Sequence, residues 1–115
     1  MAQTKTAQNS LINKKTVAVF FGGRSPEHDV SVISGLQALQ ALDNALYNTM
    51  PVYIAPDGAW YVGDILRRRE SYMLSGDRLK EVTEVTLDVK GTRGGVLIPK
   101  KTSMFGAPKP ITFDI

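Results

Sequence analysis

The sequence contains no cysteine and a single histidine among its 115 residues. Without cysteine the chain can form neither disulfide bonds nor a thiolate metal site, which is typical of proteins in a reducing compartment. It has no apolar run approaching the roughly 20 residues that span a bilayer, and residues 1–15 lack the apolar segment of a secretory signal. These absences predict a cytoplasmic protein with no membrane partner.

A large excess of one charge is also missing. The 14 Lys and Arg residues against 11 Asp and Glu leave a net charge of +3, whereas a nucleic-acid-binding domain gathers basic residues on one surface. The hydrophobic fraction of 43% is that of an ordinary globular domain, and a chain of this length can bury a single core. We therefore expect no nucleic-acid partner and one domain over residues 14–115. Residues 1–13 are polar and are predicted to form a disordered leader.

Residues 17–35 carry most of the functional information. Residues 17–21 read Val-Ala-Val-Phe-Phe, an unbroken apolar run typical of a strand covered on both faces in an α/β sheet. Gly22 and Gly23 follow, and glycine adopts backbone angles closed to other residues and leaves space beside the backbone. We expect this doublet mainly to let a substrate approach, with a generic strand-to-helix turn as the alternative.

A helix is predicted to begin directly after the glycine loop. Ser25 is the expected N-cap and Pro26 the expected first helical residue, because proline gives up an N–H that has no intrahelical partner there. Glu27, His28 and Asp29 then occupy the first turn, at the carboxyl end of the preceding strand. Open α/β sheets bind their ligands at that end, so this turn is the candidate site.

Apolar residues spaced by three or four continue along this helix and are predicted to face the sheet. They are Ile33, Leu36, Leu39, Leu42 and Leu46. The helix is predicted to end between Asn44 and Asn48, because asparagine tolerates the left-handed conformation that often ends a helix.

The remainder of the chain is rich in β-prone segments. These lie at 47–54, 59–62, 84–89, 94–99 and 111–115. The Ala-Pro-Asp-Gly turn at 55–58 predicts a hairpin between segments 47–54 and 59–62. A second hairpin is expected between 84–89 and 94–99. Asp64 can cap a short helix over 65–70. The segment 111–115 reads as an unfinished strand, which we interpret as a truncation. The strand–helix–strand order favours an α/β fold whose mostly parallel sheet is flanked by helices and carries an added β-hairpin.

Residues 22–31 read Gly-Gly-Arg-Ser-Pro-Glu-His-Asp-Val-Ser. They resemble the N-terminal signature of the D-alanine–D-alanine ligases, a Gly-Gly-x-Ser-x-Glu-[His/Arg]-x-Val-Ser loop and helix. Residues 51–60 are similar to the second strand and Asp-Gly-x-Trp turn of the longer members, and 113–115 resemble the start of the strand that leads to the family's His-Gly and Gly-Glu-Asp-Gly segments. The resemblance covers about residues 14–115. It implies the Rossmann-like, pre-ATP-grasp domain, without the family's central and C-terminal ATP-grasp domains.

The resemblance also implies an activity and a site. The family uses ATP to phosphorylate one D-alanine on its carboxylate, and the amino group of a second D-alanine attacks the acyl phosphate to give the dipeptide of peptidoglycan precursors. The family glutamate that falls on Glu27 holds the ammonium of the first D-alanine and is the one catalytic-site residue carried over. The substrate-binding residues assigned around it are Gly22, Gly23, Ser25, Glu27, His28, Val30 and Ser31.

The resemblance places ATP and magnesium on the family's other domains. We therefore expect no metal ligands in this chain and no cofactor bound by it alone. The expected partners are D-alanine through Glu27, the ATP-grasp domains, and a second copy of the chain in a homodimer. Such a dimer would pair either the surface meant for the central domain or the strand at Ile115.

Several of these residues have structural explanations. An acid such as Glu27 in a first helical turn is stabilised by about 0.3–1 kcal/mol through the helix dipole. A lone His28 is usually satisfied by a neighbour and argues no metal, although it can orient Glu27 or the substrate. Ser25 and Ser31 are predicted to act as a cap and a helix-to-loop hydrogen bond, since no general base accompanies them as nucleophiles.

Two other functions stay open from the residues. One is a non-catalytic module derived from this domain that binds a partner chain. The other is a mononucleotide-binding half-domain that holds phosphate at the glycine loop and helix N-terminus. Glu27 would repel a phosphate at that place, which disfavours the second. The ligase domain is the interpretation that the motif favours.

Overall fold

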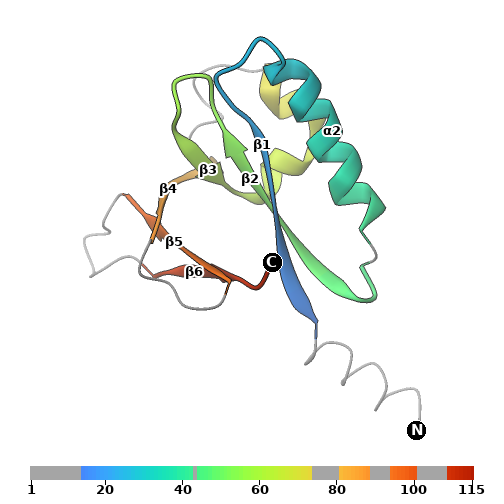
Figure 1. The fold of residues 1–115 in the computed structure, drawn as a ribbon, viewed down its shortest axis with the longest axis vertical. Helices are drawn as coiled ribbons and strands as arrows, with labels where there is room; N and C mark the ends of the chain where they lie inside the picture. The colour runs from blue at the N-terminus through green and yellow to red at the C-terminus, as the bar shows by residue number, and fades with distance from the viewer. Residues whose placement is uncertain (1–13, 43, 74–80, 89–93, 101–108) are drawn as a thin grey trace, which may run out of the picture.

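The computed structural model describes residues 14–42, 44–73, 81–88, 94–100 and 109–115, so the predicted leader at 1–13 lies outside the described residues (Figure 1). The strands are β1 (Lys15–Gly22), β2 (Tyr47–Ile54), β3 (Trp60–Val62), β4 (Thr83–Leu87), β5 (Gly95–Pro99) and β6 (Ile111–Phe113). The helices are α2 (His28–Ala41) and two short 3₁₀ helices, η1 (Asp64–Arg67) and η2 (Arg69–Met73). No helix in the described ranges has the length and apolar character needed to cross a membrane.

The six described strands form one sheet in chain order, from β1 to β6. β1 and β2 are parallel, and the other four described pairings are antiparallel. The α/β class is therefore confirmed, whereas the mostly parallel sheet was a wrong prediction. A parallel pair needs a crossover helix, and α2 supplies it between β1 and β2. The tight turn after β2 reverses the chain, and the predicted hairpins β2–β3 and β4–β5 are both present.

The sheet curls so that its last residues lie beside its first strand. The Ala18 N–H donates to the Ile115 carbonyl at 2.8 Å, and the Asp114 N–H donates to the Thr16 carbonyl at 2.8 Å. The Asp114 carboxylate also accepts a hydrogen bond from the Thr16 N–H at 2.8 Å. Figure 1 shows the C-terminal residue next to β1. The backbone of residues 114–115 thus already pairs with β1, which leaves less of it for the strand-paired homodimer considered above.

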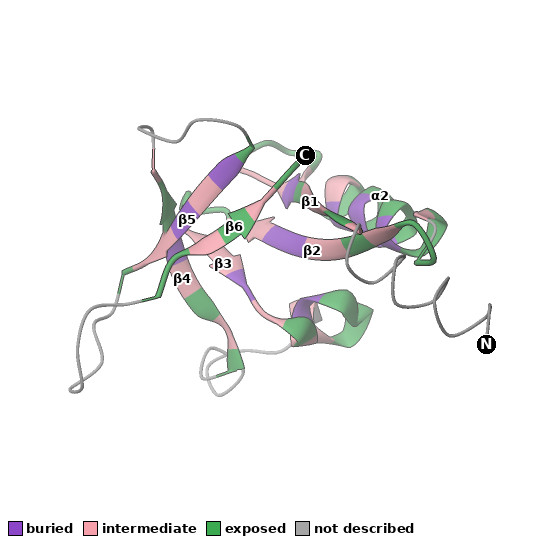
Figure 2. Cartoon of the chain, turned by 90° about the horizontal axis from the view of Figure 1, so that it is seen from below, coloured by how far each residue is buried: buried purple, intermediate pink, exposed green. Residues whose placement is uncertain are grey.

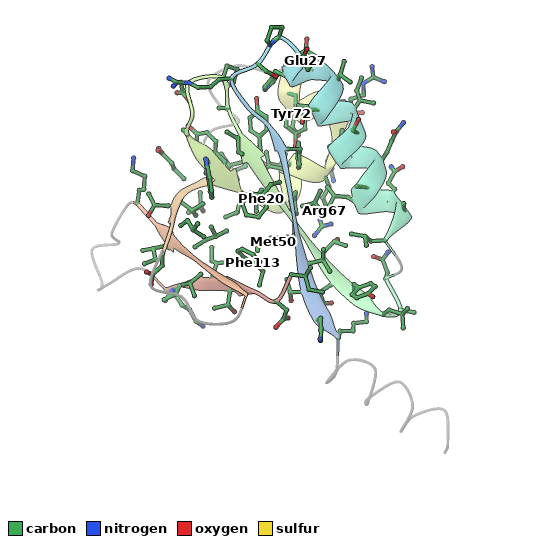
Figure 3. All side chains as sticks on the ribbon, in the orientation of Figure 1. Phe20, Glu27, Met50, Arg67, Tyr72 and Phe113 are labelled. Atoms are coloured by element: carbon green, nitrogen blue, oxygen red, sulfur yellow. The ribbon has the colours of Figure 1, made fainter. Side chains whose placement is uncertain are left out.

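Each face of the β1–β2 pair has its own apolar core. Figure 1 shows α2 on one side of this pair and β4 to β6 on the other. The core away from α2 is built from the buried residues Val52, Val62, Val85 and Leu97. The Phe20 ring closes it with edge-on contacts to Trp60 and Phe113, at centroid distances of 5.3 and 5.7 Å. Figure 3 shows Phe20, Met50 and Phe113 together on this side, and the partly buried Trp60 also packs against this core.

The core under α2 corrects the predicted helix face. It is built from the buried residues Phe21, Val32, Leu36 and Leu39, and Figure 2 shows the opposite side of α2 as exposed. Leu36 and Leu39 are buried as predicted, but Ile33 is 42% exposed and Val32 takes its place. Gly35 determines which side of α2 faces the sheet, because α2 approaches Phe21 of β1 most closely at this glycine. Leu46 is 59% exposed because α2 has already ended.

Both ends of α2 differ from the sequence-based prediction. The helix begins at His28 rather than Pro26, and Ser25 accepts the Glu27 N–H through Oγ at 3.2 Å and the His28 N–H through its carbonyl at 3.0 Å. Residues 25–27 therefore form a turn before the helix. The helix ends at Ala41, where Leu42 adopts an extended conformation, rather than between 44 and 48. The predicted helix over 65–70 is present as the two 3₁₀ turns.

Candidate functional site

The glycine loop joins β1 to α2 and forms the floor of the candidate site. Gly22 and Gly23 have φ angles of +101° and +102°, a region that favours glycine. A Cβ added at Gly22 would lie 2.2 Å from the Ile54 carbonyl oxygen, whereas one at Gly23 would meet nothing within 4 Å. Gly22 is thus required by its contact with β2. Gly23 is the position that leaves open space above the loop.

Hydrogen bonds hold the glycine loop against the β2–β3 turn. The Gly23 N–H donates to the Ile54 carbonyl at 2.8 Å. Arg24 donates through Nε to the Pro56 carbonyl and through Nη2 to the Asp57 carbonyl, each at 3.4 Å. The two turns therefore form one connected layer at the carboxyl ends of the parallel strands, the end at which α/β sheets bind ligands.

Ser31 ties the loop to the first turn of α2. Its Oγ accepts the Gly22 N–H at 2.9 Å, and its own N–H donates to the Glu27 carbonyl at 2.8 Å. The predicted helix-to-loop hydrogen bond is confirmed. The prediction of Ser25 as the N-cap is wrong, because Glu27 occupies that position and Ser25 Oγ accepts the Glu27 N–H in the turn before the helix. Both hydroxyls therefore bind backbone N–H groups rather than acting as activated nucleophiles.

Glu27 is exposed and lies immediately before α2, at the end of the molecule where Figure 3 labels it. Its backbone is held on both sides, by Ser25 at its N–H and by Ser31 at its carbonyl. In contrast, its carboxylate makes no hydrogen bond or ion pair with any of the described residues. Glu27 therefore presents an exposed carboxylate, without a described protein partner, on a backbone that is held on both sides.

His28 is satisfied by neighbours, as expected for a lone histidine. Its Nε2 lies 2.7 Å from the Tyr53 hydroxyl and its Nδ1 lies 3.0 Å from Asp29 Oδ1, and the side chain is only 17% exposed. Burial, and then the nearby carboxylates of Asp29 and Asp57, raise the pKa of Tyr53 above its usual value of 10.0. Tyr53 thus stays a neutral hydroxyl at the inner edge of the site.

Tyr53 is the residue that the sequence analysis missed. It lies on β2 in register with Phe21 of β1, so the parallel pairing brings it to the carboxyl end of the sheet. No local sequence pattern around Tyr53 indicates that His28 is its partner, since the two residues are 25 positions apart. The parallel β1–α2–β2 unit was the available signal, because it places the last residues of β2 beside the loop that follows β1.

A cavity of about 430 Å³ borders Tyr53, and His28 is not among its lining residues. It is lined by Tyr53, Ala55, Pro56, Asp57, Tyr61, Ile65, Leu66, Ser71, Tyr72 and Val82. The Tyr72 hydroxyl donates to the Leu66 carbonyl, and burial together with Tyr53 raises the pKa of Tyr72. None of the sequence-predicted site residues is in this lining, so the cavity and the Glu27 turn are separate features that share Tyr53.

The structure brings together most of the predicted site residues. Hydrogen bonds connect the glycine doublet, the two serines, Glu27 and His28 into one loop and turn. Val30 is 63% exposed and takes no part in these bonds. Its assignment to substrate binding stays a prediction.

The described residues do not fit a magnesium–nucleotide site. Magnesium in such sites is held by carboxylates together with the phosphates, and the described ranges contain no group of three or more His, Asp or Glu side chains able to hold a metal. The Glu27 carboxylate beside the glycine loop would also oppose a phosphate there. No chemical step is therefore assigned to a metal or nucleotide on these residues.

Comparison with known proteins bears on the same region. The family model described as the N-terminus of D-ala D-ala ligase matches residues 16–106, which include β1, the glycine loop, α2 and the strands up to β5. The chain belongs to this family. The resemblance in residues 22–31 is thereby confirmed.

Relatives of this ligase N-terminal domain are much longer than the chain. It is 38% identical to the D-alanine–D-alanine ligase of Rhodococcus erythropolis over 99 residues, which are 83% of the chain and 26% of that relative. It is 46% identical to the ligase of Chloroherpeton thalassium over 57 residues, 50% of the chain and 16% of that relative. The chain thus spans about a quarter or less of these relatives.

Solved structures show the same fold for the ligase N-terminal domain. The D-alanine–D-alanine ligase of Coxiella burnetii superposes with a TM-score of 0.61 at 23% identity, covering 72% of this chain and 24% of that one. The VanG D-Ala:D-Ser ligase of Enterococcus faecalis gives a TM-score of 0.57 at 22% identity, covering 73% and 25%. At these identities the likeness concerns the fold.

Proposed function

We propose that this chain is the substrate-binding N-terminal domain of an ATP-dependent D-alanine–D-alanine ligase, and that Glu27 binds the ammonium group of the first D-alanine. The observation that carries the proposal is the Glu27 carboxylate, which is exposed and free of described protein partners while its backbone is hydrogen-bonded on both sides. The hydrogen-bonded backbone fixes where the side chain starts, and the carboxylate itself is open to a cationic group.

The chemistry of the turn suits an amino-acid ammonium. A carboxylate accepts short, charge-assisted hydrogen bonds from an ammonium. Gly23 leaves the space beside the loop open for the rest of the amino acid. In this proposal Glu27 binds and orients the first D-alanine.

The activity of the complete protein belongs to the same proposal. It would join two D-alanines into the dipeptide used for peptidoglycan, in the cytoplasm, with ATP and magnesium bound by the ATP-grasp domains of the family. The two solved neighbours act, by their names, on D-alanine with D-alanine and on D-alanine with D-serine. The second substrate is therefore not assigned from this domain.

A non-catalytic partner-binding module is the second candidate. The phosphate-binding half-domain is disfavoured by the position of Glu27 at the glycine loop.

A titration followed by amide NMR tests the proposal on the 115-residue chain. Adding D-alanine should shift the amide signals of Gly23, Glu27 and Ser31, with an affinity that is millimolar or weaker because an exposed ion pair is screened by solvent. D-lactate, which replaces the ammonium by a hydroxyl, should shift them much less. Glu27→Gln should abolish the difference between the two ligands, and Glu70→Gln, the same change at an exposed position on η2, should not.

Two results would contradict the proposal. Equal shifts with D-alanine and D-lactate in the parent chain would show that no ammonium is recognised. A preference for D-alanine that survives Glu27→Gln would place the ammonium on another residue.

A further inference from the structure

We infer that Tyr53 is a positioning residue for the first D-alanine site, because its hydroxyl fixes His28 and thereby the turn that presents Glu27. This inference rests on the proposed role of Glu27 in binding the ammonium. Tyr53 itself would not touch the substrate. Its effect would pass through His28, the residue that follows Glu27 in the chain.

The Tyr53 ring is packed on three sides. Its centroid lies 4.9 Å from that of Tyr72, 5.9 Å from that of Phe21 and 5.6 Å from that of His28. Phe21 belongs to the buried core under α2, and Tyr53 and Tyr72 pack against that core. The hydroxyl is therefore carried by a ring with little freedom to move, which makes it a fixed reference point for the loop above.

His28 is bound at both ring nitrogens. An ionised Asp29 only accepts hydrogen bonds, so in the neutral imidazole Nδ1 carries the proton and Nε2 accepts the Tyr53 O–H. When the imidazole is protonated, Nε2 donates and the same hydroxyl accepts. The 2.7 Å contact can therefore persist in both protonation states. A hydroxyl is the group that allows this, because it can donate or accept.

The hydrogen bonds of the His28 side chain constrain Glu27 through the backbone that connects the two residues. The His28 N–H donates to the Ser25 carbonyl at 3.0 Å, and the Glu27 N–H is bound by Ser25 Oγ at 3.2 Å. Glu27 has φ −85° and ψ 12°, in the sparsely populated region between helical and extended conformations. Its conformation is thus set by the contacts around the turn rather than by the helix. The bond from Tyr53 to His28 joins the start of α2 to β2, beside the bond that the Gly23 N–H makes to the Ile54 carbonyl.

Tyr61 provides a matched control. It lies on β3 directly opposite Tyr53 in the hairpin register and lines the same cavity. Within the described residues, however, its hydroxyl makes no hydrogen bond. Replacing either tyrosine by phenylalanine removes one hydroxyl and keeps the ring, so the two variants differ in whether the contact with His28 is lost.

Steady-state kinetics of the ligase that carries this domain test the inference. Tyr53→Phe should raise the KM for the first D-alanine about three- to ten-fold, the change expected for one hydrogen bond, with the KM for ATP nearly unchanged and the thermal midpoint slightly lowered. Tyr61→Phe should leave all three values unchanged. The double variant Tyr53→Phe with His28→Ala should be no worse than His28→Ala alone, because both remove one interaction.

The outcomes separate this inference from the proposed function. A first-site KM that is unchanged in Glu27→Gln would overturn the proposed role of Glu27 itself. A large effect of Glu27→Gln together with no effect of Tyr53→Phe, or with equal effects of Tyr53→Phe and Tyr61→Phe, would overturn only the inference about Tyr53. Additive effects of Tyr53→Phe and His28→Ala would likewise show that Tyr53 does not act through His28.

A second measurement needs no substrate. His28 is the only histidine in the sequence, so its ring ¹⁵N resonances can be assigned without ambiguity in the 115-residue chain. Tyr53→Phe should shift the Nε2 resonance while Tyr61→Phe leaves it in place. An Nε2 resonance that is the same in all three proteins would rule out the hydrogen bond on which the inference depends.

Discussion

Gly35 of α2 lies against the ring of Phe21 on β1, so closely that a Cβ at position 35 would come within 2.4 Å of that ring. The contact explains two features of the fold. It lets the helix approach the sheet directly behind the glycine loop, and it sets which side of α2 is buried. The contact at Gly35 therefore determines how α2, and the Glu27 turn that precedes it, lies on the sheet.

Replacing Gly35 by alanine should destabilise the domain. Alanine gains up to about 1 kcal/mol in helix propensity, but the added methyl group overpacks the contact, which costs about 1–3 kcal/mol, and the Phe21 ring is buried with little room to move. We expect a net loss in the free energy of unfolding, measured by chemical denaturation. Ser34→Ala, at the exposed neighbouring position, is the control and should be neutral or slightly stabilising. A Gly35→Ala variant more stable than the parent would refute the close contact.

The buried face of α2 predicts a second contrast. Leu36→Ala and Leu39→Ala should each lower the free energy of unfolding by about 2–5 kcal/mol, because both side chains lie in the core with Phe21. Ile33→Ala removes a side chain of similar size from an exposed position and should cost much less. Chemical denaturation of the three variants tests this contrast. An Ile33→Ala variant that loses as much free energy of unfolding as Leu36→Ala would mean that the helix is rotated relative to the sheet.

The pKa values of the tyrosines predict how stability depends on pH. Burial raises the pKa of Tyr72 well above its usual value of 10.0, and Tyr53 adds to the shift. Folding therefore favours the neutral phenol, so this contribution to stability is fully present below pH 10 and is lost as the pH rises above it. Tyr72→Phe should be less stable at neutral pH, because the hydrogen bond to Leu66 is lost, but should lose less stability between pH 9 and 11. An equally steep loss in this variant would exclude Tyr72 as a cause.

The 115-residue chain should fold, yet it should neither bind Mg-ATP at micromolar concentration nor form the dipeptide. The described residues include two apolar cores but no carboxylate cluster that fits magnesium. Calorimetric titration with Mg-ATP and a phosphate-release assay with D-alanine are the measurements. Micromolar binding or dipeptide formation would contradict the assignment of nucleotide chemistry to other domains.

Local sequence signals predicted the parts of the fold that local chemistry determines. The apolar run before Gly22, the turn at 55–58 and the two hairpins are each encoded by a few adjacent residues, and all are present. The prediction of a mostly parallel sheet was wrong because it assumed parallel pairing beyond β1 and β2, the pair that α2 connects. The short turn after Ile54 already excluded it, since such turns join antiparallel strands.

The phase of α2 and the role of Tyr53 depend on distant contacts. Val32 and Ile33 are both apolar and adjacent, so periodicity alone could not decide which is buried, and the answer lies in the fit of Gly35 to Phe21. The sequence identified the loop, Glu27 and His28 from one motif. The partner of His28 is supplied by β2 through the parallel register, which no pattern near Tyr53 reveals.

The central claim is that Glu27 holds the ammonium of the first D-alanine, and the most direct test is the kinetics of Glu27→Gln in the ligase that carries this domain. Loss of a hydrogen bond to a charged group should lower kcat/KM for the first D-alanine by about 10- to 100-fold, with the KM for ATP unchanged and Glu70→Gln indistinguishable from the parent. A Glu27→Gln enzyme with the parent's first-site KM and kcat would contradict the account.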